Sequence, residues 1–423
     1  MNILLENFRC FAGKHTINIT PLTLLVGENS AGKSTFLAAL SVISDFSSYP
    51  SKPRFDMPPY NLGGFDTIVT HSNKGTANAF SLGFEIQTDD KAKNIRIIAS
   101  YSADLGQATL CTFRIESQYG CITLSYEENI LRCQLSQFQE LKGQNAQIKL
   151  DREQVPPLKL KSIEMLLAAI LNASQEKILL LELLQPIMQM SRLIESVSFG
   201  GISVAPIRSK PKRTYDQLMT DYDPEGDHVP YAIARAFQKD EQTLKELNQF
   251  GKESGLFNEI SVKNLGDKLS DPFQLHVKMS QMSAEMSVNL TDVGYGVSQS
   301  LPIIVQSVLR SGADFLLLQQ PEVHLHPKAQ AALGSFFVQQ VTENHKRFVI
   351  ETHSDYLLDR IRQAVASGLI MPQQVSIIFF DKPLLETTIH HLSLDDNGNI
   401  LDVPPSYRRF FLEEEMNILM RGS

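Results

Sequence analysis

A glycine-containing stretch near the start of the chain constrains its fold more than any other feature. The sequence GENSAGKST at residues 27–35 fits G-x-x-x-x-G-K-[ST] at every fixed position. It follows the apolar run PLTLLVG, which is typical of a buried strand, and it precedes helical apolar spacing over residues 34–44. Strand, loop and helix in this order are the context that a phosphate-binding loop requires. We therefore expect an α/β fold that binds a nucleoside triphosphate.

The residues of this loop have separate expected roles. Its glycines let successive backbone N–H groups point at phosphate oxygens, and the following helix adds the positive end of its dipole. Lys33 is expected to neutralise the β and γ phosphates and Ser34 to coordinate Mg²⁺, so that ATP and Mg²⁺ are the expected cofactors. The expected ATP-binding residues are Gly27, Glu28, Asn29, Ser30, Ala31, Gly32, Lys33, Ser34 and Thr35.

Composition excludes several classes of protein. The chain has 423 residues, a net charge of −8 and an ordinary share of apolar residues, so wholesale coating of nucleic acid is not expected. The four cysteines lack C-x-x-C spacing and are typical of reduced thiols in the cytoplasm. The N-terminus carries charges too early for a signal peptide, and charged residues interrupt the most apolar stretch, residues 163–190. We expect a cytoplasmic protein that does not span a membrane.

Periodicity predicts the remaining organisation. Residues 3–11 and 14–19 are predicted to be strands joined by FAGK, and short alternating runs from TIVTH at residue 67 to ILRCQL at residue 130 predict an antiparallel β region. The pattern of residues 158–197 predicts a helical insertion broken at Asn172 and Pro186. The predicted parts are 1–64, the N-terminal half of a nucleotide-binding head; 65–150, a β subdomain; 151–200, a helical insertion; and 201–423, the C-terminal half of the head.

The last part of the chain returns to alternating helices and strands. One amphipathic helix is predicted over residues 231–251, and a final helix over residues 407–420. Between them, predicted strands and helices alternate through ADFLLLQQ, residues 327–343, RFVIETHS, residues 356–367, QVSIIFFDK and TTIHHLSLD. Buried strands alternating with helices predict a parallel sheet shared with the start of the chain.

Five sequence blocks occur in an order that resembles a known family. The start, ILLENFRCFAGKHTINITPLTLLVGENSAGKST, resembles SMC- and RecF-type ABC ATPases. APIRSKPKRTYD, LTDVGYGVSQSLPII, LLLQQPEVHLHPKAQ and VIETHSDYLLDRIR resemble the OLD-like ABC ATPases of prokaryotic genome-defence systems. The resemblance implies an ABC-type P-loop ATPase head with an antiparallel β subdomain and a helical insertion.

The resemblance also implies partners and further site residues. In such ATPases two heads meet head to tail, with ATP between one phosphate loop and the partner's signature segment. Here that segment is residues 292–299, and it departs from the usual L-S-G-G-Q wording. His353 matches the switch histidine. The expected contacts to the nucleotide of the partner are made by Asp292, Gly294, Gly296, Ser298 and Gln299.

The implied role is that of a sensor or scaffold subunit in antiphage defence, which controls a separate effector such as a nuclease or toxin. No cluster of acids like the Toprim nuclease domain of OLD proteins follows the ATPase half. Two alternatives stay open: a DNA-binding repair ATPase of RecF type, and a scaffold that binds ATP without hydrolysing it.

The two acids that end the Walker B strand in most relatives are absent. Gln319 and Gln320 occupy their positions, and Glu322 follows. Glutamine cannot accept a proton from water near pH 7, which costs about a hundred- to ten-thousandfold in rate. Three explanations remain. OLD-like relatives often read E-Q-P-E here, so in the first explanation Gln320 is natural and Gln319 replaces a glutamate, either naturally or as an engineered change that traps bound ATP. In the second, Glu322 or a partner's group acts as the base, and in the third the protein is an ATP-binding switch with little turnover. The expected catalytic residues are Gln319, Gln320, Glu322 and His353, with Gln319 beside Ser34 at the metal.

Two further features have alternative explanations. The basic segment, residues 208–215, holds four cations within six residues and is either a phosphate-contacting surface or a solvated loop, the second being favoured slightly. His324 and His326 have the spacing of a strand-like metal pair, but without further ligands nearby they are more simply explained as shaping the loop after the Walker B strand.

Overall fold

The computed structural model divides the chain into two compact units. Unit 1 comprises residues 1–19, 38–200 and 382–388, and unit 2 comprises residues 20–37, 201–381 and 389–423. The structure describes residues 1–407 except 45, 47–54, 57, 73–74, 88–93, 128–129, 140–144, 152–176, 197–199, 217–220, 268–270, 280–285, 310–314 and 383–385. Within the described part, no helix is long and apolar enough to cross a membrane. The predicted helix at 407–420, except Tyr407, and the first half of the predicted helical insertion lie outside the described residues.

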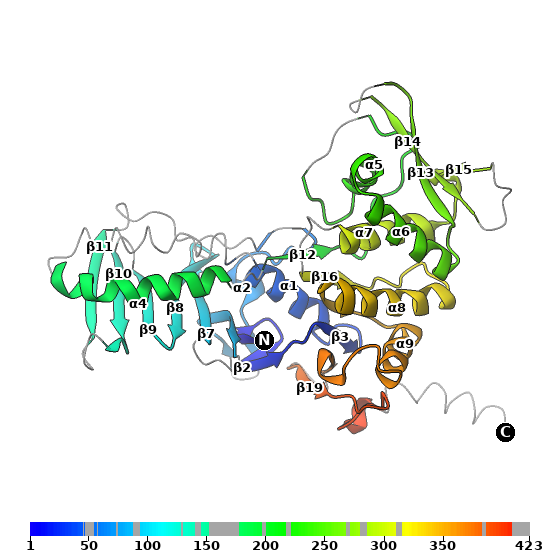
Figure 1. Cartoon of the computed structure of the whole chain (residues 1–423). Coiled ribbons are helices and arrows are strands. Elements are labelled where there is room, and N and C mark those ends of the chain that lie inside the picture. Colours follow the sequence, from blue (N-terminus) through cyan, green and yellow to red (C-terminus); the bar gives the residue numbers. More distant parts are fainter. Residues whose placement is uncertain are drawn as a thin grey trace. The chain divides into compact units, whose positions relative to one another are not determined.

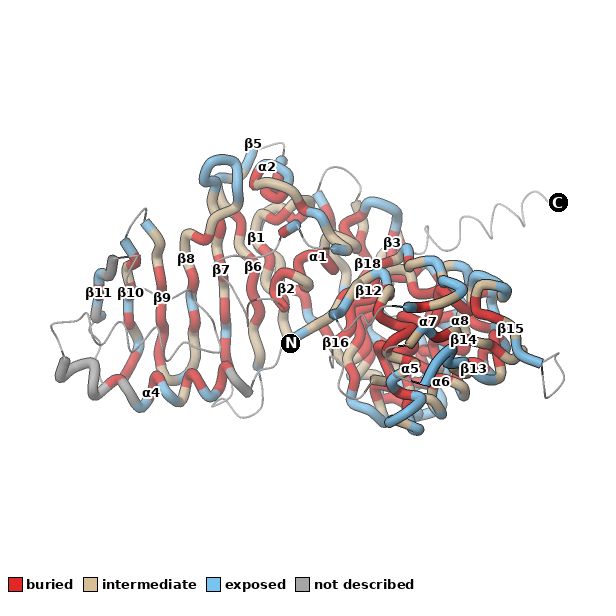
Figure 2. Tube along the Cα trace, turned by 90° about the horizontal axis from the view of Figure 1, so that it is seen from above, coloured by how far each residue is buried: buried red, intermediate tan, exposed pale blue. Residues whose placement is uncertain are grey.

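Unit 1 is built on an antiparallel sheet (Figure 1). Burial alternates along its strands, for example along β7, as expected for a sheet with one face more covered than the other (Figure 2). The strands, in their order across the sheet, are β11 (Ala146–Asp151), β10 (Ile130–Ser136), β9 (Gly120–Glu127), β8 (Gln107–Ser117), β7 (Ile95–Asp104), β6 (Ala79–Ile86), β1 (Asn2–Phe8) and β2 (Phe11–Asn18).

Helix α4 (Lys177–Ser196) crosses the strands β8 to β11 in Figure 1. The predicted break at Pro186 is wrong, because the helix continues through this proline. A proline inside a helix costs about 3 kcal/mol. Leu183, Ile187, Met190 and Ile194 are buried at helical spacing on both sides of Pro186, so one continuous apolar face offsets that cost.

Two smaller elements of unit 1 also differ from the prediction. The TIVTH segment begins as the short helix α2 (Phe65–Ile68), since the Thr67 hydroxyl donates to the carbonyls of Leu62 and Gly64 and closes a turn. The turn between β1 and β2 falls at Arg9 and Cys10 rather than at FAGK. The remaining described elements of unit 1 are β4 (His71–Ser72) and β5 (Gly75–Thr76).

Unit 2 contains a mainly parallel sheet whose central strands are almost fully buried. Continuous apolar strands of this kind are typical of a sheet covered by helices on both faces. The sheet order is β12 (Gly201–Val204), β16 (Phe315–Gln319), β17 (Arg347–Glu351), β3 (Leu22–Gly27), β18 (Val375–Asp381) and β19 (Thr388–Leu392). The strand β3, early in the sequence, therefore lies between two strands from the last quarter of the chain, an order that the sequence analysis did not predict.

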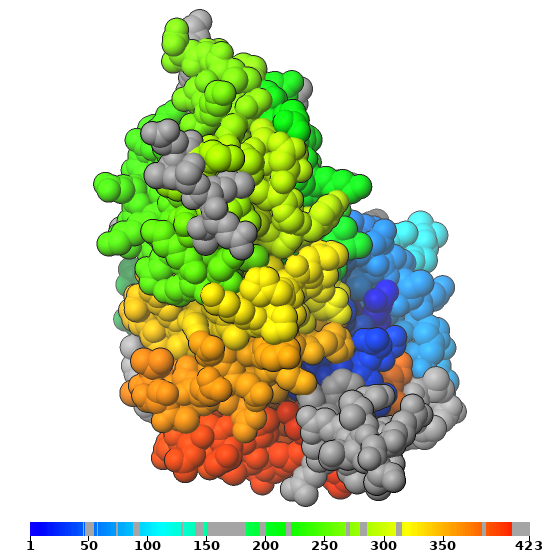
Figure 3. Space-filling view, turned by 90° about the vertical axis from the view of Figure 1, so that its right-hand side faces the viewer, coloured from blue at the N-terminus to red at the C-terminus, as the bar shows by residue number. Residues whose placement is uncertain are grey.

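The helices of unit 2 surround this sheet. Helix α8 packs against both α6 and α9, and Figure 3 shows these three in succession on one face. The helices are α1 (Lys33–Ser44), which begins in this unit, α5 (Val229–Lys239), α6 (Glu241–Ser254), α7 (Tyr295–Val308), α8 (Pro327–Asn344) and α9 (Asp355–Ala366). A small sheet consists of β13 (Glu259–Asn264), β14 (Phe273–Lys278) and β15 (Val288–Asn289), and the short helices are η6 (Leu290–Asp292) and η7 (Pro372–Gln374).

The single helix predicted over residues 231–251 is wrong, because the structure has two helices there. Asp240 separates α5 from α6 with a non-helical backbone, and its side chain accepts a hydrogen bond from the Thr243 N–H at 3.1 Å. An aspartate in this geometry caps the start of a new helix.

Candidate nucleotide site

The phosphate loop, residues 27–35, joins β3 to α1 as predicted. Gly27, Ser30 and Gly32 have positive φ angles of 135°, 62° and 110°. A Cβ at Gly27 would lie 2.2 Å from the carbonyl oxygen of Phe380 on β18. Only glycine fits at this position, so the close approach of β3 to β18 and the curl of the loop depend on it.

Lys33 lies inside this loop and is only 3% exposed. Its Nζ donates to the carbonyl oxygens of Gly27 at 2.8 Å and Glu28 at 2.6 Å. Burial lowers the pKa of Lys33, and the nearby carboxylates of Glu351 and Glu28 oppose that shift. The loop therefore already curls around a cation, which is the charge that phosphate oxygens require.

Ser34 meets the ends of two neighbouring strands. Its Oγ donates to the two carboxylate oxygens of Glu351, at distances of 3.0 and 2.8 Å, and Gln319 Nε2 donates to Ser34 Oγ at 3.0 Å. Gln319 ends β16 and Glu351 ends β17, and the two are paired in register. The structure thus brings together the predicted Ser34 and Gln319, and adds an acid that the sequence analysis missed.

Glu351 is 4% exposed. Burial raises the pKa of its carboxyl, and the hydrogen bond from Ser34 and the charge of Lys33 oppose the shift. The signal for Glu351 that the sequence offered was its position at the end of a predicted strand, directly before Thr352 and His353. Which strand neighbours Gln319 was not readable from the sequence.

The oxygen atoms at this place fit a magnesium ion. Mg²⁺ prefers hard oxygen ligands and is usually held by one or two carboxylates together with substrate phosphates. Ser34 and Glu351 supply a hydroxyl and a carboxylate side by side. No group of three or more His, Cys, Asp or Glu side chains suited to a metal occurs in the described parts of the chain. An ion at Ser34 would therefore depend on phosphate oxygens to complete its coordination.

The loop after Gln319 is tied to the loop after Glu351. Gln320 has a φ of 45°, and its N–H donates to the carbonyl of Glu351 at 2.8 Å. Glu322 is 7% exposed, and its Oε1 accepts from the His353 N–H at 2.7 Å. Burial raises the pKa of Glu322, opposed chiefly by that hydrogen bond. Glu322 thus holds the backbone of His353 in place.

His353 itself is exposed at the end of β17. Partial burial lowers its pKa, and the positive charge of Lys33 lowers it further. A pKa below 6.5 keeps the imidazole neutral at pH 7, when one ring nitrogen can donate a hydrogen bond and the other can accept one.

Arg208 links this site to the signature segment. Its guanidinium is 3% exposed and donates to the carbonyls of Gln299 at 3.2 Å, Gln319 at 3.5 Å and Gln320 at 3.3 Å. Burial lowers the pKa of Arg208 to about 10, and Glu322 opposes that shift. The explanation of the basic segment as a solvated loop is therefore wrong for Arg208, whereas Lys210, Lys212 and Arg213 are exposed.

The predicted signature residues lie at the start of α7, in different environments. Asp292 and Gly294 are exposed, and Asp292 forms a 2.6 Å ion pair with Arg213. Ser298 is 8% exposed and its hydroxyl donates to the Tyr295 carbonyl.

The other two signature residues are more constrained. Gln299 is buried and donates to the Arg208 carbonyl at 3.3 Å, so this side chain serves the interior. A Cβ on Gly296 would meet the His324 carbonyl at 3.0 Å. A glycine here keeps the loop after the Walker B strand close to α7.

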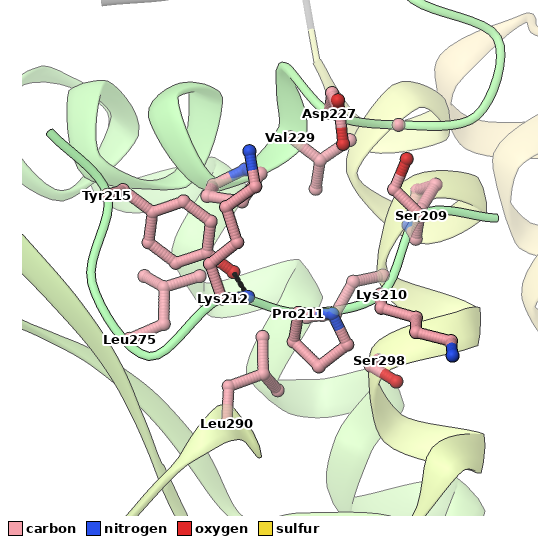
Figure 4. Close-up of a pocket in the computed structure, with 14 residues that line it drawn as sticks. Ser209, Lys210, Pro211, Lys212, Tyr215, Asp227, Val229, Leu275, Leu290 and Ser298 are labelled. Carbon is pink, nitrogen blue, oxygen red and sulfur yellow. Dashed lines mark hydrogen bonds between the residues drawn. The ribbon is translucent and has the colours of Figure 1, made fainter. Parts of the chain in front are cut away.

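A pocket lies beside this segment (Figure 4). Ser298 on α7 lines it together with Lys210, Pro211 and Lys212 of the basic segment. The Lys212 N–H donates to the Tyr215 hydroxyl at 3.0 Å, which closes the turn of the basic segment. The basic segment thus lies against the signature helix.

The histidines after the Walker B strand shape a loop. His326 caps α8, where its Nδ1 accepts from the Ala329 N–H at 3.2 Å. The His324 ring is 5.8 Å from the Tyr295 ring of the signature segment. These contacts favour the loop-shaping explanation over a metal pair.

Comparison with known proteins identifies the family. A family model described as an AAA ATPase domain matches residues 1–153 and 122–358. No curated protein matches the chain. Among solved structures, an Smc head bound to the C-winged helix domain of ScpA is 14% identical, with a TM-score of 0.50 over 93% of this chain and 97% of that chain.

Two further Smc heads are similar. The Pyrococcus furiosus Smc head domain with an extended coiled coil, bound to the C-terminal domain of ScpA, is 10% identical, with a TM-score of 0.49 over 99% of this chain and 98% of that one. The SMC head domain from Thermotoga maritima is 12% identical, with a TM-score of 0.42 over 92% and 97%.

The likeness to the first of these structures confirms the predicted fold class, an ABC-type head with an antiparallel β subdomain. The family match runs through the phosphate loop and both strand ends described above. The chain belongs to the AAA ATPase domain family, and its fold is that of an SMC head.

Proposed function

We propose that the chain binds ATP with Mg²⁺ between two protomers arranged head to tail, and that nucleotide binding and slow hydrolysis act as a conformational switch. The loop carbonyls around Lys33 and the meeting of Ser34 with the ends of β16 and β17 carry this proposal. A buried lysine, a loop with inward-curled backbone and a hydroxyl beside a carboxylate are together what the polyphosphate of ATP and its metal need.

Mg²⁺, when bound with ATP, would neutralise charge on the phosphate oxygens. The chain's own residues would do the rest. Lys33 would exchange its loop carbonyls for phosphate oxygens, and Ser34 would face the ion. His353, held by Glu322 and neutral at pH 7, would donate a hydrogen bond toward the γ-phosphate. Gln320 stands where a base would accept a proton and cannot do so, which is why we propose slow turnover.

The signature segment supports the dimer. Asp292, Gly294 and Tyr295 are exposed at the N-terminus of α7, where the positive end of the helix dipole favours an anion. Arg208 bonds the Gln299 carbonyl near the start of this helix and the carbonyls that end the Walker B strand of the same protomer. A change at either place would therefore reach the other through one rigid group.

A mixing experiment tests the head-to-tail arrangement. Lys33→Ala removes the phosphate loop's cation, and Gly294→Glu places a negative charge on the signature segment. A Cβ on Gly294 would have nothing within 4 Å, and the φ of this residue is −61°, so each protomer should still fold. Neither variant alone should dimerise with ATP, whereas an equimolar mixture can form one intact site per heterodimer. The measurement is mass by light scattering after gel filtration with MgATP.

Gly294→Ala is the matched control and should dimerise like the original chain. If the mixture stays monomeric while the original chain dimerises, the two segments do not share a nucleotide. If the original chain does not bind ATP at all, the proposed function itself fails.

We further propose that this switch serves antiphage defence, as a sensor or scaffold for a separate effector. The order of the sequence blocks that resemble OLD-like proteins supports this role. The test is to tag the chain in its host, trap it with a slowly hydrolysed ATP analogue, and identify the proteins that co-purify before and during phage infection. A defence role predicts a nuclease or toxin whose association depends on Lys33. An unchanged set of partners in Lys33→Ala would contradict it.

The RecF-type alternative has one observation in its favour. Lys210, Lys212 and Arg213 are exposed beside the signature helix, where they could contact nucleic-acid phosphates. Fluorescence anisotropy with a labelled duplex separates the two functions. DNA binding that strengthens with ATP and weakens steeply with salt would favour the alternative, and Lys210→Glu should then abolish it.

A further inference from the structure

We infer that Glu351 supplies the carboxylate that the Walker B strand lacks, so that the metal-side acid of this ATPase stands on the neighbouring strand, β17. The inference rests on the proposed function, because it assigns a residue to the magnesium ion that accompanies ATP. The position of Glu351 before Thr352 and His353 in the sequence does not by itself indicate this role.

The geometry that carries the inference is the register of two parallel strands. Gln319 and Glu351 are paired at the ends of β16 and β17, and both reach Ser34. The three side chains form one chain of hydrogen bonds, from the Gln319 amide to the Ser34 hydroxyl and from that hydroxyl to the Glu351 carboxylate. An acid on either strand end would thus lie beside the same hydroxyl.

The direction of these bonds shows what each side chain can offer. A carboxylate only accepts, so the Ser34 proton points to Glu351, and the Ser34 oxygen accepts from the amide of Gln319. Gln319 therefore presents its amide nitrogen to Ser34, and its side chain brings no negative charge to the ion. Glu351 presents a carboxylate that accepts the hydrogen bond from the Ser34 hydroxyl, so the serine oxygen keeps one lone pair for the ion beside the one that faces Gln319.

Glu351 is 4% exposed, so little solvent screens its carboxylate, and the charge of Lys33 favours the ionised form against the cost of burial. When phosphate oxygens take over Lys33, Glu351 loses part of that compensation, and a divalent ion beside Ser34 would replace it. Magnesium and nucleotide should therefore bind with strong mutual dependence.

The experiment compares ATP affinity in excess Mg²⁺ and in EDTA by calorimetry, and the affinity for Mn²⁺ in the presence of nucleotide by electron paramagnetic resonance. The variants are Glu351→Gln, the exchange variant Glu351→Gln with Gln319→Glu, and Glu343→Gln. Glu343 is an exposed acid on α8 and controls for the loss of one negative charge.

Glu351→Gln should weaken Mn²⁺ binding by about 10–100-fold, the usual cost of losing a group that supports a metal ligand. ATP affinity in EDTA should stay within about threefold of the original chain, which also shows that the variant folds, since no ion is then present for the carboxylate to assist. The exchange variant should recover Mn²⁺ binding, because it returns the acid to the paired position on β16. Glu343→Gln should match the original chain in every measurement.

Mn²⁺ affinity in Glu351→Gln close to that of the original chain would overturn the inference while leaving ATP binding, and so the proposed function, intact. If Glu351→Gln also loses ATP binding in EDTA, the exchange variant is the deciding measurement. Recovery of Mn²⁺ binding in that variant supports the inference, and failure to recover it overturns the inference. Absence of ATP binding by the original chain would instead be the failure of the proposed function.

Discussion

Replacing Arg208 with methionine should destabilise unit 2 strongly. The change keeps most of the length of the side chain but removes the donors to three backbone carbonyls, at 3.2, 3.5 and 3.3 Å. It also leaves Glu322 without the opposing charge of Arg208. The bond to the Gln299 carbonyl is buried and those to Gln319 and Gln320 are half-buried, and methionine offers none of these carbonyls a donor.

The magnitude follows from these contacts. Hydrogen bonds from a charged donor contribute about 1.5–3 kcal/mol each, and these long ones belong at or below the lower end. Three such bonds sum to at most about 4.5 kcal/mol, and recovery of the arginine's desolvation cost reduces that sum, so that the expected loss is about 2–4 kcal/mol.

The assay is urea unfolding followed by far-UV circular dichroism and tyrosine fluorescence, since the chain has no tryptophan. Arg213→Met is the matched control from the same segment. Arg213 is 65% exposed in its ion pair with Asp292, so its loss should cost only about 0.2–1 kcal/mol. If Arg208→Met and Arg213→Met lower the free energy of unfolding equally, the buried guanidinium is not the link that the geometry indicates.

Three further results are expected. Gln320→Glu should raise phosphate release by about 10²–10⁴-fold because it restores a proton acceptor, whereas Gln319→Glu should raise it much less if Glu351 already serves the metal; equal rates in the two variants would contradict this division of roles. Gly27→Ala should lower the free energy of unfolding by more than about 2 kcal/mol, since alanine is strained at a φ of 135° and its Cβ would strike the Phe380 carbonyl, and a thermal midpoint equal to that of the original chain would refute it. Burial lowers the pKa of His228, so the free energy of unfolding should fall as pH drops through the unfolded-state value near 6.5; His228→Gln should flatten that slope in urea titrations at several pH values, and an unchanged slope would show that other groups cause it.

Local patterns were enough to predict the phosphate loop, because the motif, the strand before it and the helix after it are contiguous in sequence. They also predicted α8, β17, α9 and β18, whose apolar runs are long and clearly bounded. The break between α5 and α6 was missed because the helical spacing of apolar residues continues across Asp240. Asp240 nevertheless ends one helix and caps the next. Pro186 caused the opposite error, a predicted break in a helix that is continuous. Burial of apolar side chains on both sides of the proline outweighs its local cost to the helix.

The features that the sequence concealed depend on contacts between distant segments. Glu351 is 317 residues from the Ser34 hydroxyl that it accepts from, and only the strand order brings them together. Arg208 lies in the same stretch of sequence as its exposed neighbours Lys210 and Lys212, and nothing in that stretch indicates which of the cations is buried. A motif search limited to β16 would describe this site as lacking an acid, although the neighbouring strand β17 ends in Glu351.

The hydrogen bonds of Lys33 to the carbonyls of Gly27 and Glu28 have a consequence for selectivity among anions. An incoming ligand competes with these two carbonyls for two of the three N–H donors of the ammonium. A lone sulfate or orthophosphate offers few oxygens with which to compensate, whereas a polyphosphate tail can occupy the backbone N–H groups and the ammonium at once. The carbonyl oxygens of the loop thus hold the Lys33 ammonium in place, and sulfate or orthophosphate should compete with them less well than a polyphosphate does.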